Sequence, residues 1–477
     1  MNAILTMSSF LFPLITFPYV SRVLLDVGTG KVSWAASVVA YFTMFAQLGI
    51  PTYGIRACAR VRDDKEELSR TAHELFAINM LMTVFSYILL AVGIIFVPKL
   101  QEEKTLIVIT SLTIILSAIG MEWLFKAMEQ YTYITVRSII FKAISVAAMF
   151  FLVKQESDYI IYAAITVFAS SASFILNFIN ARRYIYMHPV GRYDLRRHFK
   201  PVMIFFAMAC ATTVYTHLDV VMLGFMKTDS DVGYYNAAVR IKTILVSIVT
   251  SLGTVLLPRA SYYVMHGMKK EFGEITRKAL NFVFIAAVPL TLYFIFFAKE
   301  GILFLAGDAF EGSILPMQII MPTLLLIGLT NILGVQILTP LGREKAVLLS
   351  EIAGAVVDII LNAILIPSMA SAGAATGTLV AEFAVLVVQY IALRDEIRRA
   401  FLHVSYLKII VAVVLGSAAC IWLKFLHLGN FLTLLISAVL FFGVYLGVLY
   451  ISKEPLVREV SGQILTKLKR LTGRAAD

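Results

Sequence analysis

The chain has 477 residues, 60% of them hydrophobic and 15% charged, with a mean hydropathy of +0.85. Soluble domains carry roughly a quarter charged residues, so this composition excludes an ordinary soluble protein and indicates a polytopic membrane protein. The net charge is +11, but the cations are spread over short segments between apolar stretches. That pattern favours contact with anionic membrane lipids and speaks against nucleic acid as a partner.

Apolar stretches of about 20 residues, long enough to cross a bilayer, follow one another along the chain. The first lacks the basic region and cleavage site of a signal peptide, so it is interpreted as a retained span. We therefore expect an all-α polytopic membrane protein with about fourteen transmembrane helices. They are predicted near residues 2–25, 32–55, 74–97, 105–125, 134–153, 159–179, 203–226, 232–257, 279–298, 314–338, 347–369, 374–393, 404–423 and 431–451.

The cations predict the orientation of these spans. If the connecting segments alternate between the two sides, about three quarters of the 41 Lys and Arg residues fall on one side, which the positive-inside rule makes cytoplasmic. Both termini are then cytoplasmic. The connections on the other side are short, and the longest, 299–313, holds no catalytic constellation.

The longest polar interruption, NARRYIYMHPVGRYDLRRHFK at 180–200, divides the predicted spans into two groups. We expect an N-lobe (1–180), a basic cytoplasmic linker (181–200), a C-lobe (201–395), two further helices (396–452) and a basic cytoplasmic tail (453–477). A faint internal echo relates the lobes as a parallel pseudo-twofold repeat of six helices each. It matches Gly30, Leu48-Gly49, Pro51 and Arg56 with Gly233, Leu252-Gly253, Pro258 and Arg259.

Patterns for catalysis or cofactor binding are missing from the sequence. Cys58, Cys210 and Cys420 are isolated thiols without metal-ligand or disulfide spacing. The GTGK at 28–31 lacks the first glycine and the final Ser or Thr of a phosphate-binding loop. We expect no enzyme activity and no cofactor. Any transport would depend on an ion gradient, the membrane potential or consumption of the product.

Ionisable side chains within the spans carry the functional information, since each costs several kcal/mol unless it is paired or lines a wet cavity. Asp219 and Arg240 lie at matching depth on consecutive spans. They form either a structural ion pair or part of a cavity in which Arg240 meets an anionic ligand. Lys242 lies about 200° around the helix from Arg240. At most one of the two is expected to point centrally, and Arg240 is preferred.

Further charges lie on later and earlier spans. Asp358 falls near mid-depth and Glu382 lies on the next span. Glu122 and Lys126 stand one helical turn apart, so an ion pair between them is the default interpretation. His217, two residues before Asp219, is expected to be packed or hydrogen-bonded rather than to relay protons.

Arg22 lies near the predicted external end of the first span, in ITFPYVSRVL (15–24). It either extends to lipid phosphates or lines a cavity. Pro13 and Pro18 would kink this helix and turn Arg22 inward, where its guanidinium suits phosphate oxygens. We favour the cavity.

Several segments in order resemble the polysaccharide transporter (Wzx-type flippase) family of the multidrug/oligosaccharidyl-lipid/polysaccharide exporter superfamily. They are FPLITFPYVSRVL (12–24), YFTMFAQLGIPTYGIRACARVRDDKEEL (41–68), LDVVMLG (218–224), VGYYNAAVRIK (232–242) and DIILNAILIPSMASAGAATGTLVAE (358–382). The resemblance implies a bacterial plasma-membrane flippase for undecaprenyl-diphosphate-linked oligosaccharide units, with two six-helix lobes around a cationic cavity and an alternating-access mechanism.

The resemblance also implies roles for the charged residues. Arg22 and Arg240, with Lys242 as a further cavity cation, would contact diphosphate or sugars. Asp219, Asp358 and Glu382 would be counter-charges, gates or sites for a coupling ion, and Glu122 is grouped with them. Gly49, Gly54, Gly373 and Gly377 would permit close helix contact or turns. The sequence leaves open whether the ion is a proton or sodium, and whether a polysaccharide polymerase is a partner.

Three alternatives remain at this point. A drug exporter of the same superfamily would extrude organic cations and should have a cavity dominated by carboxylates. A peptidoglycan-precursor (lipid II) flippase fits the charges equally well. A non-transport scaffold is disfavoured mildly, because prolines within or at the ends of spans indicate bent helices.

Overall fold

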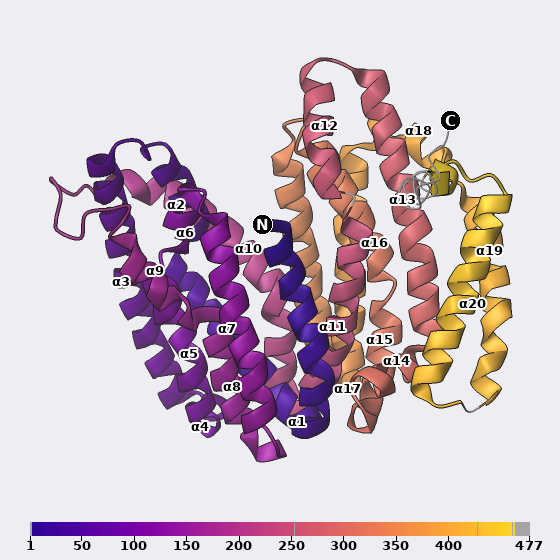
Figure 1. The fold of residues 1–477 in the computed structure, drawn as a ribbon, viewed down its shortest axis with the longest axis horizontal. Coiled ribbons are helices and arrows are strands. Elements are labelled where there is room, and N and C mark those ends of the chain that lie inside the picture. Colours follow the sequence, from indigo (N-terminus) through magenta and orange to yellow (C-terminus); the bar gives the residue numbers. More distant parts are fainter. Residues whose placement is uncertain (1, 252, 427, 460, 463–477) are drawn as a thin grey trace, which may run out of the picture. The chain divides into compact units, whose positions relative to one another are not determined.

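The computed structural model describes residues 2–251, 253–426, 428–459 and 461–462 (Figure 1). These residues form helices and connecting turns, with no β-strand among them, which confirms the predicted all-α class. The chain divides into two compact units, Met1–Asn236 and Ala237–Asp477. We call them the first and second unit and describe each by itself.

The first unit is arranged around its longest helix. Helix α1 contacts α3, α5, α7, α8 and α10. The helices are α1 (Asn2–Gln47), α2 (Ile50–Ala59), α3 (Lys65–Phe96), α4 (Pro98–Glu102), α5 (Lys104–Ile119), α6 (Glu122–Ala127), α7 (Tyr131–Leu152), η1 (Glu156–Asp158), α8 (Tyr159–Val167), the π-helical turn η2 (Phe168–Ala172), α9 (Phe174–Ala181) and α10 (Arg196–Met226). Helix α11 (Asp229–Thr250) begins in this unit and continues into the second.

The second unit contains another very long helix, α17, which contacts α15, α16 and η4. The last two long helices, α19 and α20, pack on each other, and both contact α13. The helices are α12 (Gly253–Met265), α13 (Lys269–Phe296), α14 (Ala298–Leu305), η3 (Asp308–Ser313), α15 (Ile314–Ile320), α16 (Thr323–Thr330), the π-helical η4 (Asn331–Leu338), α17 (Glu344–Ala392), α18 (Arg394–Leu402), α19 (Tyr406–Cys420), η5 (Ile421–Leu426) and α20 (Asn430–Ile451).

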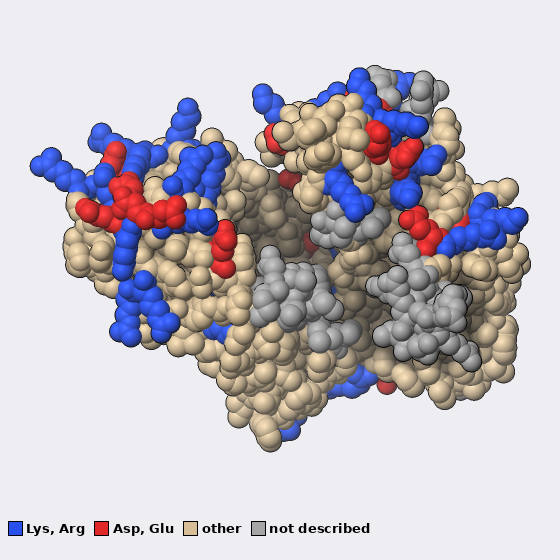
Figure 2. Space-filling model, turned by 45° about the horizontal axis from the view of Figure 1, so that its top comes forward, with Lys and Arg blue, Asp and Glu red and all other residues tan. Residues whose placement is uncertain are grey.

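Burial in helix α3 is inverted relative to a soluble protein. Its buried positions include Glu74, Asn79 and Ser86, whereas Leu81 and Phe96 are exposed. A soluble amphipathic helix turns its apolar face inward. In lipid the apolar face can point outward while small and polar residues meet inside the bundle. Figure 2 shows charged side chains grouped over limited areas, with wide uncharged stretches between them. The molecule is therefore a multi-pass membrane protein.

Nine helices among the described residues are long and apolar enough to cross a membrane, or ten if the bent pair Asp308–Ile320 and Thr323–Leu338 is one span. Two of these stretches, Ile15–Ala59 across α1 and α2 and Glu344–Ala392 in α17, are about twice the usual span length, since about 20 residues suffice. The figure of fourteen spans stays a prediction.

Helices α1 and α17 are each interrupted by one residue with positive φ. In α1 it is Leu25 (φ 55°, ψ −168°), and in α17 it is Ala370 (φ 49°, ψ −126°). The two halves of α17 fold back and pack closely against each other. A Cβ added at Gly373 would collide with the backbone of Leu365, and a Cβ added at Gly377 would collide with the side chain of Asn362. These halves match the predicted spans 347–369 and 374–393. Helix α1 has a break at Leu25, and the connection expected over 26–31 is helical. The kink at Pro13 and Pro18 stays a prediction.

The boundaries of the compact units do not follow those of the predicted lobes, which stay a prediction. The first unit includes the predicted linker and α10, because α10 packs against α1 and α2. The linker itself is bound to α3: the Tyr186 backbone N–H donates to Ser69 Oγ at 2.9 Å, and Tyr193 Oη lies 3.1 Å from His73 Nδ1. The predicted basic linker (181–200) is thus packed against α3 as part of the first unit.

Candidate functional site

A helix break inside an apolar segment borders a pocket of the first unit. Leu48 (φ 46°) and Gly49 (φ 74°) interrupt the chain between α1 and α2. Pro51 at the start of α2 cannot donate a backbone hydrogen bond, which favours a new helix start at this point. The Ala46 carbonyl next to the break accepts a hydrogen bond of 2.6 Å from the Asn79 side chain. The break is therefore supported by a buried polar partner.

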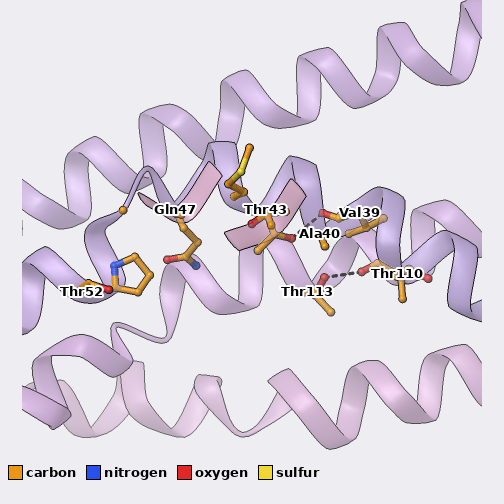
Figure 3. A pocket seen from close by; sticks show the side chains of 13 residues that line it. Val39, Ala40, Thr43, Gln47, Thr52, Thr110 and Thr113 are labelled. Atoms are coloured by element: carbon orange, nitrogen blue, oxygen red, sulfur yellow. Dashed lines mark hydrogen bonds between the residues drawn. The ribbon is translucent and has the colours of Figure 1, made fainter. Parts of the chain in front are cut away.

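The pocket beside this break has a volume of about 380 Å³ and lies among α1, α2, α5 and α10. Figure 3 shows Thr43 and Gln47 from α1 together with Thr110 and Thr113 from α5. The lining residues are uncharged: Ala36, Val39, Ala40, Thr43, Met44, Gln47, Gly49, Pro51, Thr52, Thr110, Thr113, Ala209 and Thr213. A mostly apolar wall with a few polar groups is typical of small-molecule sites. We call this the Thr43 pocket.

Three of the five threonines that line the Thr43 pocket donate their hydroxyl proton to a carbonyl of their own helix. Thr43 Oγ1 donates to the Val39 carbonyl at 2.9 Å, Thr110 Oγ1 to Leu106 at 2.8 Å and Thr113 Oγ1 to Thr110 at 2.8 Å. A hydroxyl that donates its proton to its own helix keeps lone pairs free to accept. The pocket therefore offers acceptors, while the Gln47 carboxamide can supply both donor and acceptor groups.

A second pocket in the first unit, of about 490 Å³, is lined in part by Lys31, Glu156 and Tyr159. Lys31 Nζ forms an ion pair of 2.6 Å with Glu103, and Tyr159 Oη donates to the same carboxylate at 3.2 Å. The positive charge of Lys31, the cation of this pocket, is therefore balanced by Glu103.

The structure places the predicted charges of the first unit in different surroundings. Arg22 is exposed, and its Nη1 donates to the Pro18 carbonyl at 2.6 Å. Asp219 is buried and accepts a hydrogen bond from the Tyr235 hydroxyl. His217 Nδ1 lies 3.3 Å from Ser37 Oγ, so the prediction of a hydrogen-bonded histidine is confirmed. The cavity role of Arg22 stays a prediction.

Glu122 takes part in the predicted ion pair and in one that was missed. Its contact with Lys126 is 2.8 Å, which confirms the i,i+4 pair. Arg137 is buried and contacts Glu122 at 3.2 Å and the Asn177 carboxamide oxygen. Its position 15 residues from Glu122, beyond a turn, gave no local signal for this pair.

In the second unit the predicted acids are buried and the predicted cations are half-buried. Asp358 and Glu382 lie in α17 with 3% and 4% of their surface exposed. Asp358 and Asn362 face Gly377 across the fold of α17. Arg240 and Lys242 have intermediate exposure in α11. Because Asp219 belongs to the first unit and Arg240 to the second, the ion pair between them stays a prediction.

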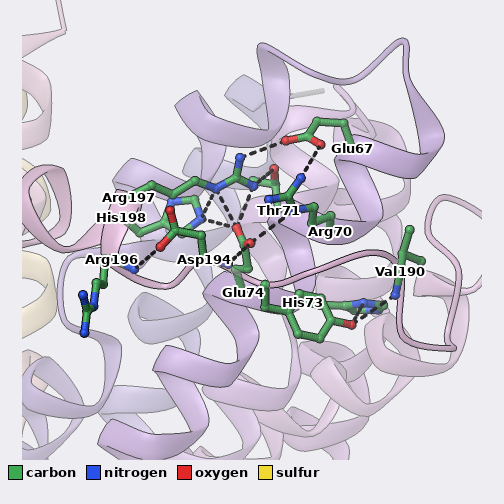
Figure 4. A network of polar contacts seen from close by, with 11 residues as sticks. Glu67, Arg70, Thr71, His73, Glu74, Val190, Asp194, Arg196, Arg197 and His198 are labelled. Atoms are coloured by element: carbon green, nitrogen blue, oxygen red, sulfur yellow. Dashed lines mark hydrogen bonds and ion pairs between the residues drawn. The ribbon is translucent and has the colours of Figure 1, made fainter.

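A charged network at the start of α10 was not found from the sequence (Figure 4). Glu74, with 0% exposure, contacts Arg197 Nη2 at 2.6 Å and His198 Nε2 at 2.7 Å, and accepts the Asp194 backbone N–H at 2.7 Å. His198 Nδ1 lies 2.9 Å from the Tyr53 hydroxyl of α2. The only sequence signal is the spacing of Glu67, Arg70 and Glu74 on one helical face.

The described residues include no group of three or more His, Cys, Asp or Glu side chains that could hold a metal ion. The fold and its sites thus define a polytopic helical membrane protein with a neutral polar pocket, helix breaks and buried charges. A model of the polysaccharide biosynthesis protein family matches residues 1–264, more than half of the chain. The chain belongs to this family, and the predicted resemblance is confirmed.

A second family model and two bacterial proteins are also similar to the chain. A MatE family model matches residues 204–364. A protein of Escherichia coli (strain K12) named "Putative O-antigen transporter" is 23% identical over 72% of this chain and 83% of its own length. A protein of the same name from Shigella dysenteriae is 24% identical over 74% of this chain and 88% of its own.

Two solved structures share the fold. The lipid II flippase MurJ in an inward closed conformation has a TM-score of 0.71 and 17% identity, covering 95% of this chain and 99% of that one. An inward-facing multidrug resistance MATE transporter of the MOP superfamily has a TM-score of 0.61 and 11% identity, covering 82% and 98%.

Proposed function

We propose that this protein is a flippase that moves undecaprenyl-diphosphate-linked oligosaccharide units from the cytoplasmic to the outer leaflet of the bacterial plasma membrane. The observation that carries the proposal is the polysaccharide biosynthesis family match over residues 1–264. The names of the two bacterial relatives, which refer to O-antigen transport, support it. The product would feed the assembly of a surface polysaccharide.

Moving a diphosphate and sugars across a bilayer requires polar groups on the inward side of the membrane-spanning helices. A diphosphate and several sugars lose their hydration in hydrocarbon at a prohibitive cost unless other polar groups replace the water. The polyprenyl chain can stay in lipid. The Thr43 pocket and the buried Asp219, Asp358 and Glu382 are groups of the required kind.

In this proposal the charged residues divide by role. Arg22 and Arg240, with Lys242, contact the diphosphate. Asp219, Asp358 and Glu382 act as counter-charges or bind a coupling proton or sodium ion during alternating access, and Glu122 holds Arg137 and Lys126 in place. Both termini lie in the cytoplasm.

The first test is the sidedness of lipid-linked oligosaccharide in cells depleted of this protein. Diphosphate-linked units should accumulate on the cytoplasmic leaflet, because a diphosphate and sugars do not cross hydrocarbon unaided, while surface polymer falls. Sidedness is measured by accessibility to an impermeant periodate label. Unchanged sidedness with unchanged polymer would contradict the flippase function.

Arg22→Ala and Arg240→Ala should each lower transport at least about tenfold, since a charge-assisted contact to phosphate contributes roughly 1.5–3 kcal/mol. Membrane insertion should be normal. Arg192→Ala, which removes an exposed cation from the linker, serves as the control. Full transport by either variant would remove that arginine from the proposed site.

A second candidate is an organic-cation antiporter, favoured by the MatE match over 204–364 and by the buried acids. Depletion would then sensitise cells to cationic drugs and leave polysaccharide unchanged. A lipid II flippase, favoured by the MurJ fold, would instead halt peptidoglycan synthesis. The depletion experiment separates all three functions.

A further inference from the structure

The Thr43 pocket has features that go beyond a general transport path. We propose that it is a saccharide subsite, which binds one uncharged sugar residue of the transported lipid-linked oligosaccharide. This inference rests on the proposed flippase function and adds to it the place where, and the groups by which, sugar is recognised.

The first argument is the position of the helix break. Backbone that departs from a helix within a membrane segment is tolerated where it is buried in protein or lines a cavity. Leu48 and Gly49 have positive φ, and Gln47, Gly49, Pro51 and Thr52 around them line the pocket. Transporters form substrate sites from interrupted helices. The break at Leu48 and Gly49 likewise borders a cavity.

The second argument is the chemistry of the lining. The residues that line the pocket carry no charge, so a diphosphate or an organic cation would lose its hydration there without a counter-charge. The hydroxyls of Thr43, Thr110 and Thr113 donate to their own helices and present acceptor lone pairs. Sugar hydroxyls are donors that match such acceptors. The apolar wall formed by Val39, Met44 and neighbouring alanines suits the C–H faces of a sugar ring.

The third argument is size and depth. A volume of about 380 Å³ lies near the lower end of small-molecule sites, roughly 300–1,000 Å³, and would hold one sugar residue but not a whole oligosaccharide. Thr43, Thr113 and Thr213, which line the pocket, lie near the middle of the predicted spans 32–55, 105–125 and 203–226. Sugar therefore meets replacement hydrogen bonds at the depth where water is scarcest.

The experiment compares two lipids that differ only in the sugar: undecaprenyl diphosphate and undecaprenyl-diphosphate-linked N-acetylglucosamine. Each is titrated against the purified full-length protein in nanodiscs, and the ratio of the two dissociation constants is measured. The wild type should bind the glycosylated lipid more tightly. Thr113→Val and Gln47→Leu should each reduce this advantage by roughly threefold to tenfold, the worth of one hydrogen bond, without changing the affinity for undecaprenyl diphosphate.

Two variants serve as controls. Thr113→Ser keeps the hydroxyl and should keep the advantage. Thr212→Val removes an exposed hydroxyl of α10 that also donates to its own helix, to Met208 at 3.1 Å, but lies outside the pocket lining, and it should behave as wild type.

The remaining outcomes contradict either the saccharide subsite alone or the flippase function together with it. An equal affinity of the wild type for both lipids, or an advantage that survives in both pocket variants, would overturn the subsite and leave the flippase function standing. Pocket variants that weaken both lipids equally would show a structural effect and also overturn it. If neither lipid binds the wild type, the flippase function fails and the subsite with it.

Discussion

The most informative single residue outside the pocket is Glu74, a carboxylate without exposed surface in a helix that exposes apolar side chains on its other side. Arg197, His198 and the Asp194 backbone N–H saturate its oxygens. A buried acid with such partners is costly to disturb, because each partner loses its hydrogen bond while remaining partly dehydrated. We interpret the network as the attachment of the linker and of the start of α10 to α3.

Glu74→Gln should destabilise the protein by about 2 kcal/mol. This is below the roughly 3–5 kcal/mol of a fully buried pair, because Arg197 is 33% exposed and keeps its contact with Glu67 at 2.8 Å. The midpoint of thermal unfolding in detergent measures the effect. Glu66→Gln, an exposed position of the same helix, should change stability by less than about 0.5 kcal/mol. Equal midpoints for the two variants would refute a stabilising network.

At the scale of elements, several glycines lie where helices approach each other closely or are interrupted. Gly54 lies against the Trp123 ring, and Gly373 and Gly377 against the opposite half of α17. The predicted role of these glycines in close helix contact is therefore confirmed. Gly49 combines two constraints, since its φ is 74° and a Cβ there would collide with the backbone of Phe205 and Phe206 in α10. Both the helix break and the close packing of α10 therefore require a residue without a side chain at position 49.

Gly49→Ala should lower stability by more than about 1 kcal/mol, because it adds both left-handed backbone strain and a collision with α10. Thermal unfolding and the monodispersity of the purified protein measure it. Gly273→Ala adds the same methyl group to α13, where a Cβ meets nothing within 4 Å, and should be neutral or slightly stabilising. If both substitutions behave alike, the close approach at Gly49 carries no stability.

At the scale of the whole molecule, the distribution of cations predicts which side each helix end faces. The linker residue Arg192 should face the cytoplasm and Gln155, between α7 and α8, the outside. Both positions are exposed. This orientation sets the direction in which the proposed flippase would move its substrate.

The orientation can be read with single cysteines introduced at Gln155 and Arg192 after Cys58, Cys210 and Cys420 are changed to alanine. An impermeant maleimide should label Gln155→Cys in intact cells and Arg192→Cys only after permeabilisation. The reverse pattern would invert the predicted topology. Labelling of both positions in intact cells would contradict the single span predicted between them, 159–179.

The sequence by itself determined the membrane class, the helical fold, the family and the local i,i+4 pair of Glu122 with Lys126, because composition and short-range spacing carry this information. Only the tertiary structure decided which polar groups meet across helices. Asn79 supports the break 33 residues away, Glu74 binds Arg197 123 residues away, and Arg137 is buried beside Asn177. In a bilayer the apolar pattern marks the face toward lipid, whereas the partners of the inward polar face depend on how the helices pack.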